Sequence, residues 1–404
     1  MKKIVALVLV AVLAFALIGC SKKAITSEEL KIGVILVGDE NEGYTYAHIE
    51  GIKGAMENLG INDDQVIWKY SIPEDETCYD TAVDLAEQGC QIIFSNSYSH
   101  QSYMVQAAEE YPDVLFCPAT GDTAAVCGLD NVVNYFPYSF ESRYVSGVVA
   151  GMKLKELMDA GTVTDPYIGY VGAYPYPEVV SGYTPFFLGI RSIVPDAHMD
   201  VLYTNEWFSL TKEAEAANTL MARGCVIIGQ HADSTGAPSS VQAKLEAGEV
   251  CYCVGYNVDM LSVAPDAALT SAQNNWVVLY TDILSAFING DEMKHDWSGG
   301  YNEDAVQISA LGSSCAAGTQ EKVDEVVAAI KDGSLHVFDT STFTVDGETL
   351  TSYMFDFSTM NADFSAVQYQ GATEECIFDG YFHESEFRSA PYFGLIIDGI
   401  TELN

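Results

Sequence analysis

The chain has 404 residues and a formal net charge of −39, from 57 acidic and only 18 basic side chains. So large a negative charge repels the phosphate backbone of nucleic acids, and the sequence has no cluster of basic residues to offset it. The composition therefore argues against nucleic acid as a partner. A chain of this length exceeds what one hydrophobic core usually serves, which predicts two lobes.

The first twenty residues are typical of an export signal. Two lysines precede an apolar run from Ile4 to Ile18, which is too short to span a membrane comfortably. The segment Leu17–Cys20 resembles a bacterial lipobox, in which the cysteine is lipidated and becomes the mature N-terminus. This predicts a protein anchored by acyl chains on Cys20 at the extracytoplasmic face of the membrane. The alternative is an ordinary cleaved signal with an incidental cysteine.

The first element of the mature chain is a strand. Ile32 to Val37 form a short, β-branched run that ends at Gly38, which is typical of a buried parallel strand. An acidic loop follows, and from Tyr44 apolar residues at spacings of three and four predict a helix that stops at Leu59-Gly60. Ligands of open α/β sheets bind at the carboxyl ends of strands, so Tyr44 is predicted to lie beside a small-molecule site.

The same alternation continues to Phe136. Strands are predicted at 65–70, 91–94, 114–117 and 131–136, and helices at 77–89 and 101–111. Strands that alternate with helices of about ten to fifteen residues indicate βαβ units and a parallel sheet. Four residues that directly follow two of these strands are candidate ligand contacts: Ser97, Tyr98, Thr120 and Gly121.

A long helix over 139–159 opens a second alternation. Its small residues, among them Gly147 and Gly151, are expected to allow close packing on the sheet. Further strands are predicted at 167–173, 200–204, 225–229 and 250–254, helices at 182–194 and 211–223, and a loop at 230–239. The chain is then expected to return to the first lobe through 255–259, a strand at 268–272 and a helix at 276–289, before a strand at 306–311 and a helix at 321–332.

The last part of the chain is rich in Phe, Tyr, Thr, Asp and Gly. Asp346-Gly347 lies inside an alternating run over 343–351 and predicts a hairpin, whereas weak periodicity over 358–388 indicates a long loop. The predicted organisation is α/β: a signal (1–20), a tether (21–30), one lobe from 31–136 and 256–305, another from 137–255 and 306–340, and a C-terminal hairpin and loop extension (341–404).

Few residues suggest chemistry. The cysteines after Cys20 are odd in number, have no zinc-ligand spacing and often lie in apolar runs, which favours small buried side chains over a disulfide framework. His231 and Asp233 share a loop, but one histidine beside one aspartate is more often a hydrogen bond than a metal or catalytic pair. The sequence has no GxSxG, P-loop or GxGxxG motif in a suitable place. We therefore expect no enzyme, no metal site and no cofactor.

Several sequence blocks occur in a specific order. They are GDENEGYTYAHIEG from Gly38, PATG from Pro118, YFPYSFESRYVSGVVAG from Tyr135, IGYVGAYPYPEVVSG from Ile168, NEWFSLTKEAEAA from Asn205, GQHADS from Gly229, VGYNVDM from Val254 and ALTSAQNNW from Ala268. With the lipobox, they resemble the BMP family of basic membrane lipoproteins, the substrate-binding components of ABC importers, as far as about Leu311. The likeness is strongest to the branch that resembles purine or adenine nucleobase binders.

The resemblance implies a type I periplasmic-binding fold, in which two doubly wound lobes joined by crossing strands close around one ligand. Family members hold purine nucleosides or nucleobases between two aromatic rings, which fall by position on Tyr44, where this branch usually has Trp, and on Trp207. Stacking gives roughly 1–3 kcal/mol per base with little selectivity, so hydrogen bonds must select the ligand. The candidate ligand-binding residues are Gly43, Tyr44, Ser97, Tyr98, Thr120, Gly121, Trp207, Gln230, Asp233, Asn257, Asp259 and Asn274.

Two of these positions bear on the ligand class. Where nucleoside binders of the family hold the ribose with an aspartate and a lysine, this chain has Asn257 and Asn274. The loss of both charges removes the charge-assisted bonds to a ribose and favours the free base. The resemblance also implies ABC permease and ATPase partners, and we expect a monomer. Alternatives are a surface receptor or sensor with the same pocket, a binder of a nucleoside or riboflavin-like ring, and a nucleoside hydrolase or phosphorylase, for which no nucleophile is apparent.

Overall fold

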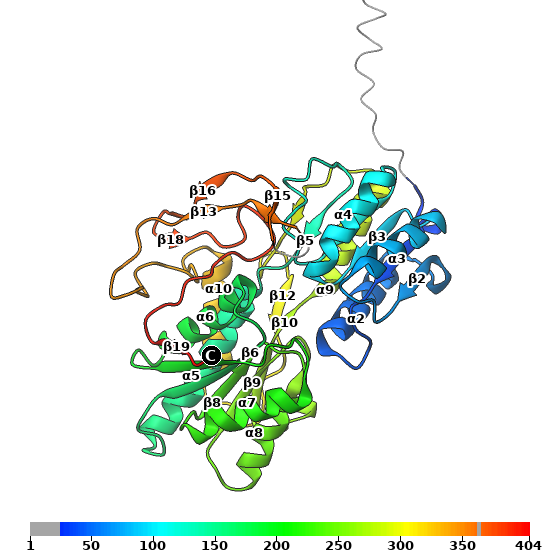
Figure 1. Ribbon diagram of the computed structural model, residues 1–404. Coiled ribbons are helices and arrows are strands. Elements are labelled where there is room, and N and C mark those ends of the chain that lie inside the picture. The colour runs from blue at the N-terminus through cyan, green and yellow to red at the C-terminus, as the bar shows by residue number, and fades with distance from the viewer. Residues whose placement is uncertain (1–24, 362–364) are drawn as a thin grey trace, which may run out of the picture.

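The computed structural model describes residues 25–361 and 365–404. It contains two α/β lobes, with the C-terminal segment lying along one side of them (Figure 1). No helix among these residues is long and apolar enough to cross a membrane. The expected signal and the lipidation site at Cys20 fall outside the described residues.

The N-terminal lobe is built on a parallel sheet with the strand order β2-β1-β3-β4. Ile32 and Val34 of β1 belong to a core shared with α2 and α9, and Ile35 belongs to the core on the opposite face, shared with α3 and α4. Because helices cover both faces, β1 is buried throughout. The elements are η1 (Ser27–Glu29), β1 (Ile32–Ile35), α2 (Gly43–Leu59), η2 (Asp63–Gln65), β2 (Val66–Lys69), α3 (Glu76–Glu87), β3 (Ile92–Ser95), η3 (Tyr98–His100), α4 (Gln101–Glu110), β4 (Leu115–Pro118) and α9 (Trp276–Asn289).

The C-terminal lobe has a larger sheet, with the order β12-β10-β9-β8-β6-β7-β19. Its strands are parallel except β12, which runs antiparallel to β10. The elements are α5 (Ser139–Asp159), β6 (Tyr167–Gly172), α6 (Pro177–Arg191), β7 (His198–Tyr203), α7 (Leu210–Ala222), β8 (Ile227–Gln230), α8 (Gly236–Glu246), β9 (Tyr252–Tyr256), η4 (Met260–Ser262), β10 (Ala268–Asn274), β12 (Val306–Ile308), α10 (Thr319–Lys331) and β19 (Ile400–Glu402).

The chain passes between the lobes three times. It leaves the N-terminal lobe after β5 (Asn134–Tyr135), returns between β10 and α9, and leaves again after β11 (Asp296–Trp297), which pairs with β5. The return was expected at residue 256, and this boundary is wrong, because β10 pairs with β9 inside the C-terminal sheet. A buried strand has the same apolar sequence pattern in either sheet, so the pattern does not indicate to which sheet the strand belongs.

The loop expected over 230–239 is shorter than its sequence suggests, since α8 begins at Gly236. Pro238 lies in the first turn of this helix, where a missing N–H costs no helical hydrogen bond. A Cβ at Gly236 would lie 2.3 Å from the carbonyl oxygen of Leu210, so α8 starts in direct contact with the start of α7.

The glycines of α5 pack against a helix and not, as expected, against the sheet. A Cβ at Gly147 would lie 2.1 Å from the carbonyl oxygen of Phe186, and one at Gly189 would lie 2.1 Å from the carbonyl oxygen of Tyr144. Backbone therefore touches backbone where α5 and α6 cross.

The C-terminal extension forms short hairpins on the C-terminal lobe. The pairs are β13 (Met354–Asp356) with β16 (Thr373–Glu375), β14 (Thr359–Met360) with β15 (Val367–Tyr369), and β17 (Ile377–Phe378) with β18 (Tyr381–Phe382). The loop expected over 358–388 thus contains strands, which are too short to show an alternating pattern. The hairpin expected over 343–351 is reduced to an isolated bridge between Val345 and Glu348.

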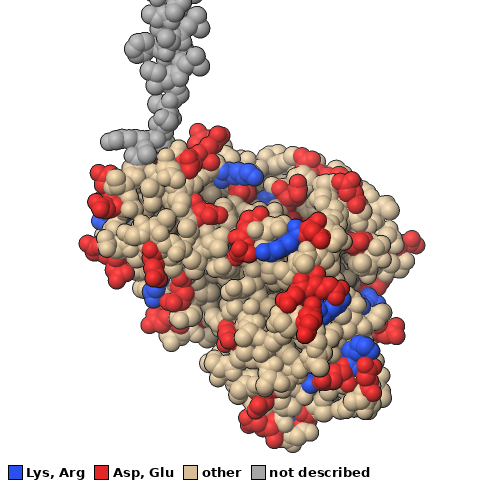
Figure 2. Space-filling view, turned by 180° about the vertical axis from the view of Figure 1, so that it is seen from behind, with Lys and Arg blue, Asp and Glu red and all other residues tan. Residues whose placement is uncertain are grey.

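Two expectations from composition can be compared with the structure. In the described chain the cysteines from Cys78 to Cys376 are all unpaired and most are buried, which agrees with their interpretation as small core residues. Acidic side chains are spread over the face shown in Figure 2, and the few basic side chains there lie beside acidic ones.

The crossing of α5 and α6 gives a direct test. Gly147→Ala is expected to lower the free energy of unfolding by about 1–3 kcal/mol, because its methyl group must displace backbone. Lys155→Ala, on an exposed position of the same helix, should change it by less than about 0.5 kcal/mol. Equal denaturation midpoints for the two variants would contradict the close crossing.

Candidate functional site

The two lobes touch where α2 begins. A Cβ at Gly43 would lie 3.1 Å from the backbone carbonyl oxygen of Asp233 in the other lobe. Gly43 follows β1 and Asp233 follows β8, so the carboxyl ends of two sheets face each other. Parallel sheets bind ligands at such an edge, and the cleft between the lobes is the candidate functional site.

Carboxylates gather at this contact. Both oxygens of Glu42 cap α2, accepting hydrogen bonds from the backbone nitrogens of Tyr44 and Thr45 at 2.9 Å each. Burial raises the pKa of Glu42 in spite of these bonds. Burial also raises the pKa of Asp233 well above its usual range, and the charges of Glu42 and Glu213 add to this. These carboxyl groups supply several oxygen acceptors, which favours ligand groups that donate hydrogen bonds.

Four predicted site residues form one connected group in the C-terminal lobe. Asn257 has a left-handed backbone (φ 62°) after β9 and donates from Nδ2 to Asp233 Oδ1 at 2.5 Å. The backbone nitrogen of Asp233 donates to the carbonyl oxygen of Trp207 at 2.8 Å. Gln230 Nε2 donates to two carbonyl groups of the 231–235 loop at 2.8 and 3.1 Å and so fixes its shape.

The two predicted stacking rings come from different lobes. The ring of Tyr44 packs edge-on against His48, with centroids 4.4 Å apart. Burial raises the pKa of Tyr44 well above its usual range. Trp207 is 36% exposed, and its ring lies 5.2 Å from that of Tyr174. A large ring that keeps an open face beside other rings is suited to stacking on a planar ligand.

The sequence analysis missed a buried cation in the C-terminal wall. Arg143 of α5 is 2% exposed and donates from Nη1 to the carbonyl oxygen of Gln230 at 2.7 Å. Its guanidinium carbon lies 3.5 Å from the centroid of the Tyr256 ring, a cation–π contact. The only signal in the sequence was a charged residue among the small and apolar residues of α5.

Arg143 also determines which ring nitrogen of His231 carries the proton. Nη2 of Arg143 lies 3.2 Å from His231 Nδ1, and His231 Nε2 lies 2.9 Å from Glu178 Oε1. Burial lowers the pKa of His231, which leaves the ring neutral. Because the arginine can only donate, Nδ1 accepts and Nε2 donates to the carboxylate. His231 is therefore hydrogen-bonded, as the sequence suggested, but its partners are Arg143 and Glu178 and not the neighbouring Asp233.

Some buried polar atoms beside the cleft have no hydrogen-bond partner within the described chain: His48 Nε2, Asn257 Oδ1, Asn274 Nδ2 and Trp276 Nε1. The rings of His48 and Trp276 stack at 3.9 Å, and neither was predicted as a site residue. Ser139 donates to Asn274 Oδ1 at 2.7 Å, which holds that amide in place. An unpaired buried polar group costs about 1–3 kcal/mol, so these atoms are suited to bind a polar ligand.

Four predicted residues lie apart from this group, at the carboxyl ends of β3 and β4: Ser97, Tyr98, Thr120 and Gly121. Ser97 donates to Glu74, and the hydroxyl of Tyr98 donates to Asp122 at 3.0 Å. Asp259 has a different role, because it is exposed and its carboxylate accepts from the backbone nitrogen of Leu261.

Two α/β lobes whose strand ends face each other, with aromatic rings and unpaired polar groups nearby, are typical of a solute-binding protein. Residues 30–338 match the family described as ABC transporter substrate-binding protein, PnrA-like, and the chain belongs to this family. The predicted family and fold class are thereby confirmed.

Individual comparisons agree with this assignment. A purine-binding protein of Brucella abortus is 32% identical over 312 residues, which cover 77% of this chain and 83% of that protein. A putative ABC transporter glucose-binding protein of Haloferax volcanii is 30% identical over 258 residues, or 64% of this chain and 61% of that protein. A solved ABC transporter solute-binding protein from Aeropyrum pernix is similar in fold, with a TM-score of 0.65 at 16% identity over 76% of this chain and 93% of that chain.

The buried carboxyl group of Glu213 predicts a pH dependence. Burial raises its pKa to about 7, although backbone groups of Ser209 and Ser234 donate to it. The folded protein thus keeps a proton that the unfolded chain releases above about pH 4.5, and this contribution to stability is lost as the pH rises towards 7. Glu213→Gln cannot ionise, so it should gain on the order of 2–3 kcal/mol relative to wild type between pH 5 and pH 8, at about 1.4 kcal/mol per pH unit.

Denaturant unfolding of both proteins at several pH values measures this difference. Glu213→Gln also loses hydrogen bonds that the carboxylate accepts, which changes its free energy of unfolding by a similar amount at every pH. Only a difference between variant and wild type that changes with pH therefore tests the raised pKa. Glu215→Gln, on an exposed position of the same helix, should follow the wild type. Parallel curves for wild type and Glu213→Gln would contradict the raised pKa.

Proposed function

We propose that this substrate-binding protein captures a purine-type nucleobase between Tyr44 and Trp207 and delivers it to an ABC permease. A lipid on Cys20 would hold it at the extracytoplasmic face of the membrane. The observation that supports the proposal is that the segments bearing the two rings meet at Asp233: Gly43, next to Tyr44, lies against its carbonyl group, and the carbonyl group of Trp207 accepts from its backbone nitrogen.

The chemistry of the cleft suits a heterocyclic base. A purine offers two flat faces, and stacking on aromatic side chains contributes roughly 1–3 kcal/mol per base. Its edge carries both N–H donors and ring-nitrogen acceptors. Asp233 and the unpaired Asn257 Oδ1 accept hydrogen bonds, while the unpaired Asn274 Nδ2 donates one. The similarity to the Brucella abortus purine-binding protein supports the same ligand class.

A free base fits better than a nucleoside. The amide nitrogen of Asn257 is occupied by Asp233, and the amide oxygen of Asn274 is occupied by Ser139. Neither position supplies the carboxylate or the ammonium group that would hold ribose hydroxyls with charge-assisted bonds. A site that hydrogen-bonds the ring edge discriminates strongly among bases, because a mismatched ligand leaves buried groups unpaired.

Lobe closure supplies the signal to the transporter. A ligand that contacts both Tyr44 and Trp207 binds the closed conformation better than the open one and so shifts the population towards it. The permease then recognises the closed form, as a hinged binding protein requires.

The ligand claim predicts a selective response in a thermal-shift screen of residues 22–404. The panel contains adenine, guanine, hypoxanthine, xanthine, uracil, their nucleosides, riboflavin and glucose. A purine base at a hundredfold excess over its Kd should stabilise the folded protein by about 2.7 kcal/mol. A shift only with nucleosides, with riboflavin or with glucose would overturn the assignment to a free base.

Substitution of the rings tests the same claim by calorimetry. Tyr44→Ala and Trp207→Ala should each weaken binding of that base by about 5- to 100-fold, from the loss of stacking. Matched controls are Tyr46→Ala on the same helix and Phe208→Ala beside Trp207, both of which are exposed aromatic residues. If the controls weaken binding as much as the ring variants do, the stacking arrangement is wrong.

The anchor predicts the location of the protein. With Cys20 intact, the full chain should partition into the detergent-rich phase when a detergent extract of cell membranes is warmed past its cloud point, because acyl chains insert into the detergent micelles. Cys20→Ala should move it to the aqueous phase. Equal partitioning of the two proteins would refute the lipid.

A further inference from the structure

The C-terminal extension belongs to the core of one lobe. Its last strand, β19, pairs with β7, and Leu403 donates from its backbone nitrogen to the carbonyl oxygen of Val201 at 2.9 Å. Glu384 is buried and accepts from the backbone nitrogens of Tyr392 and Phe393 at 2.9 and 2.7 Å, which fixes the segment between them. Tyr392 and Phe393 also belong to the apolar core of the C-terminal lobe, so this lobe holds the segment.

This segment nevertheless makes a buried ion pair with the other lobe. Arg388 Nη1 lies 3.1 Å from Asp122 Oδ2, with side-chain exposures of 11% and 7%. Asp122 lies between β4 and β5 of the N-terminal lobe and also accepts from Gln101 Nε2 at 2.9 Å and from the hydroxyl of Tyr98 at 3.0 Å. Tyr98 is a candidate ligand contact, so the ion pair ends directly behind the cleft.

A second contact lies next to the first. Both the backbone nitrogen and the hydroxyl of Ser389 donate to Asp296 Oδ1 at 2.8 Å. Asp296 belongs to β11, directly before the third passage between the lobes. Two consecutive residues of the extension therefore bond to two separate segments of the N-terminal lobe.

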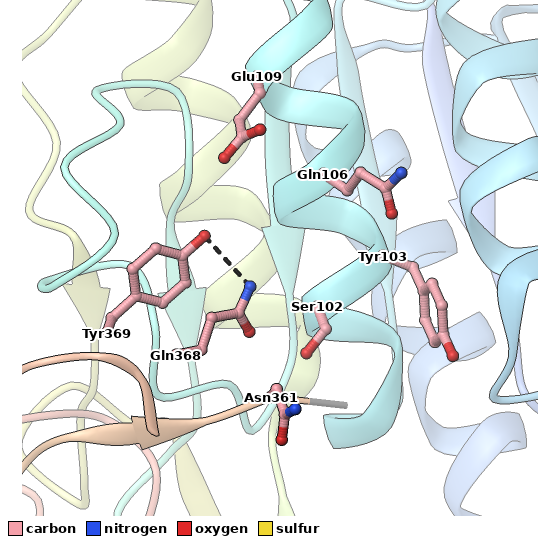
Figure 3. A pocket seen from close by; sticks show the side chains of 7 residues that line it. All are labelled: Ser102, Tyr103, Gln106, Glu109, Asn361, Gln368 and Tyr369. Atoms are coloured by element: carbon pink, nitrogen blue, oxygen red, sulfur yellow. Dashed lines mark hydrogen bonds between the residues drawn. The ribbon is translucent and has the colours of Figure 1, made fainter. Parts of the chain in front are cut away.

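A third contact lies at α4. The hairpin β14–β15 approaches this helix, and Tyr369 packs on the core shared by α3 and α4. Between them is a cavity of about 360 Å³ whose walls come from both parts of the chain (Figure 3): Ser102, Tyr103, Gln106, Glu109, Asn361, Gln368 and Tyr369. Figure 1 shows the same approach, with β15 beside the helix and the β5 region.

We propose that residues 383–404 act as a clasp that is anchored in the C-terminal lobe and ties the N-terminal lobe to it through Arg388 and Ser389, so that the extension favours the conformation in which the lobes touch. The clasp lies wholly beyond residues 30–338, the part that matches the family. It requires no ligand. Opening the cleft by rotation of the lobes would pull Asp122 and Asp296 away from a segment that cannot follow them.

Arg388→Met provides the test. It keeps an apolar stem beside Phe355 and Phe357, over which the guanidinium lies, and removes the bond to Asp122. Arg191→Met is a matched control, because Arg191 also lies over a phenylalanine ring and donates to the extension, at Asp398, but stays within the C-terminal lobe.

The distance between the lobes is measured without ligand by electron–electron double resonance. Spin labels are placed in residues 22–404 at Tyr46→Cys and Leu210→Cys, which are exposed positions in different lobes, with the half-buried Cys127 and Cys315 replaced by alanine. Arg388→Met should add a longer distance and raise the ratio of open to closed molecules about tenfold. A tenfold change in this ratio corresponds to about 1.4 kcal/mol in the free energy of opening, which is close to the contribution of one hydrogen bond to a charged group. Arg191→Met should retain the wild-type distribution.

Two further variants keep the test decisive if Arg388→Met unfolds. Ser389→Ala removes one bond to Asp296 and should open the lobes in the same direction to a smaller extent. Arg388→Lys retains a cation and should lie between wild type and Arg388→Met. Wild-type distances in both Arg388→Met and Ser389→Ala would overturn the clasp. Because no ligand enters the measurement, this result is independent of the nucleobase proposal.

Discussion

The three passages of the chain between the lobes are the constraint on which the rest of this structure depends. Neither lobe is complete until a distant segment returns to it. The helix α9 comes back from the C-terminal sheet to pack on α2, where a Cβ at Gly51 would lie 2.3 Å from the Cβ of Trp276. This packing places α2 so that its first turn meets the loop after β8. The carboxyl ends of the two sheets therefore face each other, and the cleft lies between them.

The second feature of the cleft is its charge. An acidic protein has buried further carboxyl groups, Glu42, Glu213 and Asp233, where its lobes meet, and it tolerates them because burial raises the pKa of each. The buried guanidinium of Arg143 in the same lobe is held by a carbonyl group, a histidine and a tyrosine ring. Carboxyl groups with raised pKa values can both accept and donate hydrogen bonds.

Local sequence specified most of the helices and strands. Gly60 forms a left-handed C-cap after α2, and the helix ends at Leu59, where its sequence predicted the end. The errors arose where an element depends on its neighbours. Pro238 and the small residues around it are typical of a loop, but contact with α7 allows them to form the start of α8. The sequence of β10 is compatible with either sheet, and the structure places it in the C-terminal one. The short strands of the extension are stabilised by a shared aromatic core and not by their own pattern.

The sequence by itself determined the fold class and the family, because periodicity, turn residues and ordered motifs are local properties. It predicted Tyr44, Trp207, Asp233 and Asn257 at strand ends, and the structure joins Asp233 to Asn257 and to the backbone of Trp207 by hydrogen bonds. Only the tertiary structure decided that Arg143 and His231 contact each other and that Arg388 reaches Asp122. Those contacts join residues far apart in the chain. Their existence depends on burial and on the packing of distant segments, which no local pattern records.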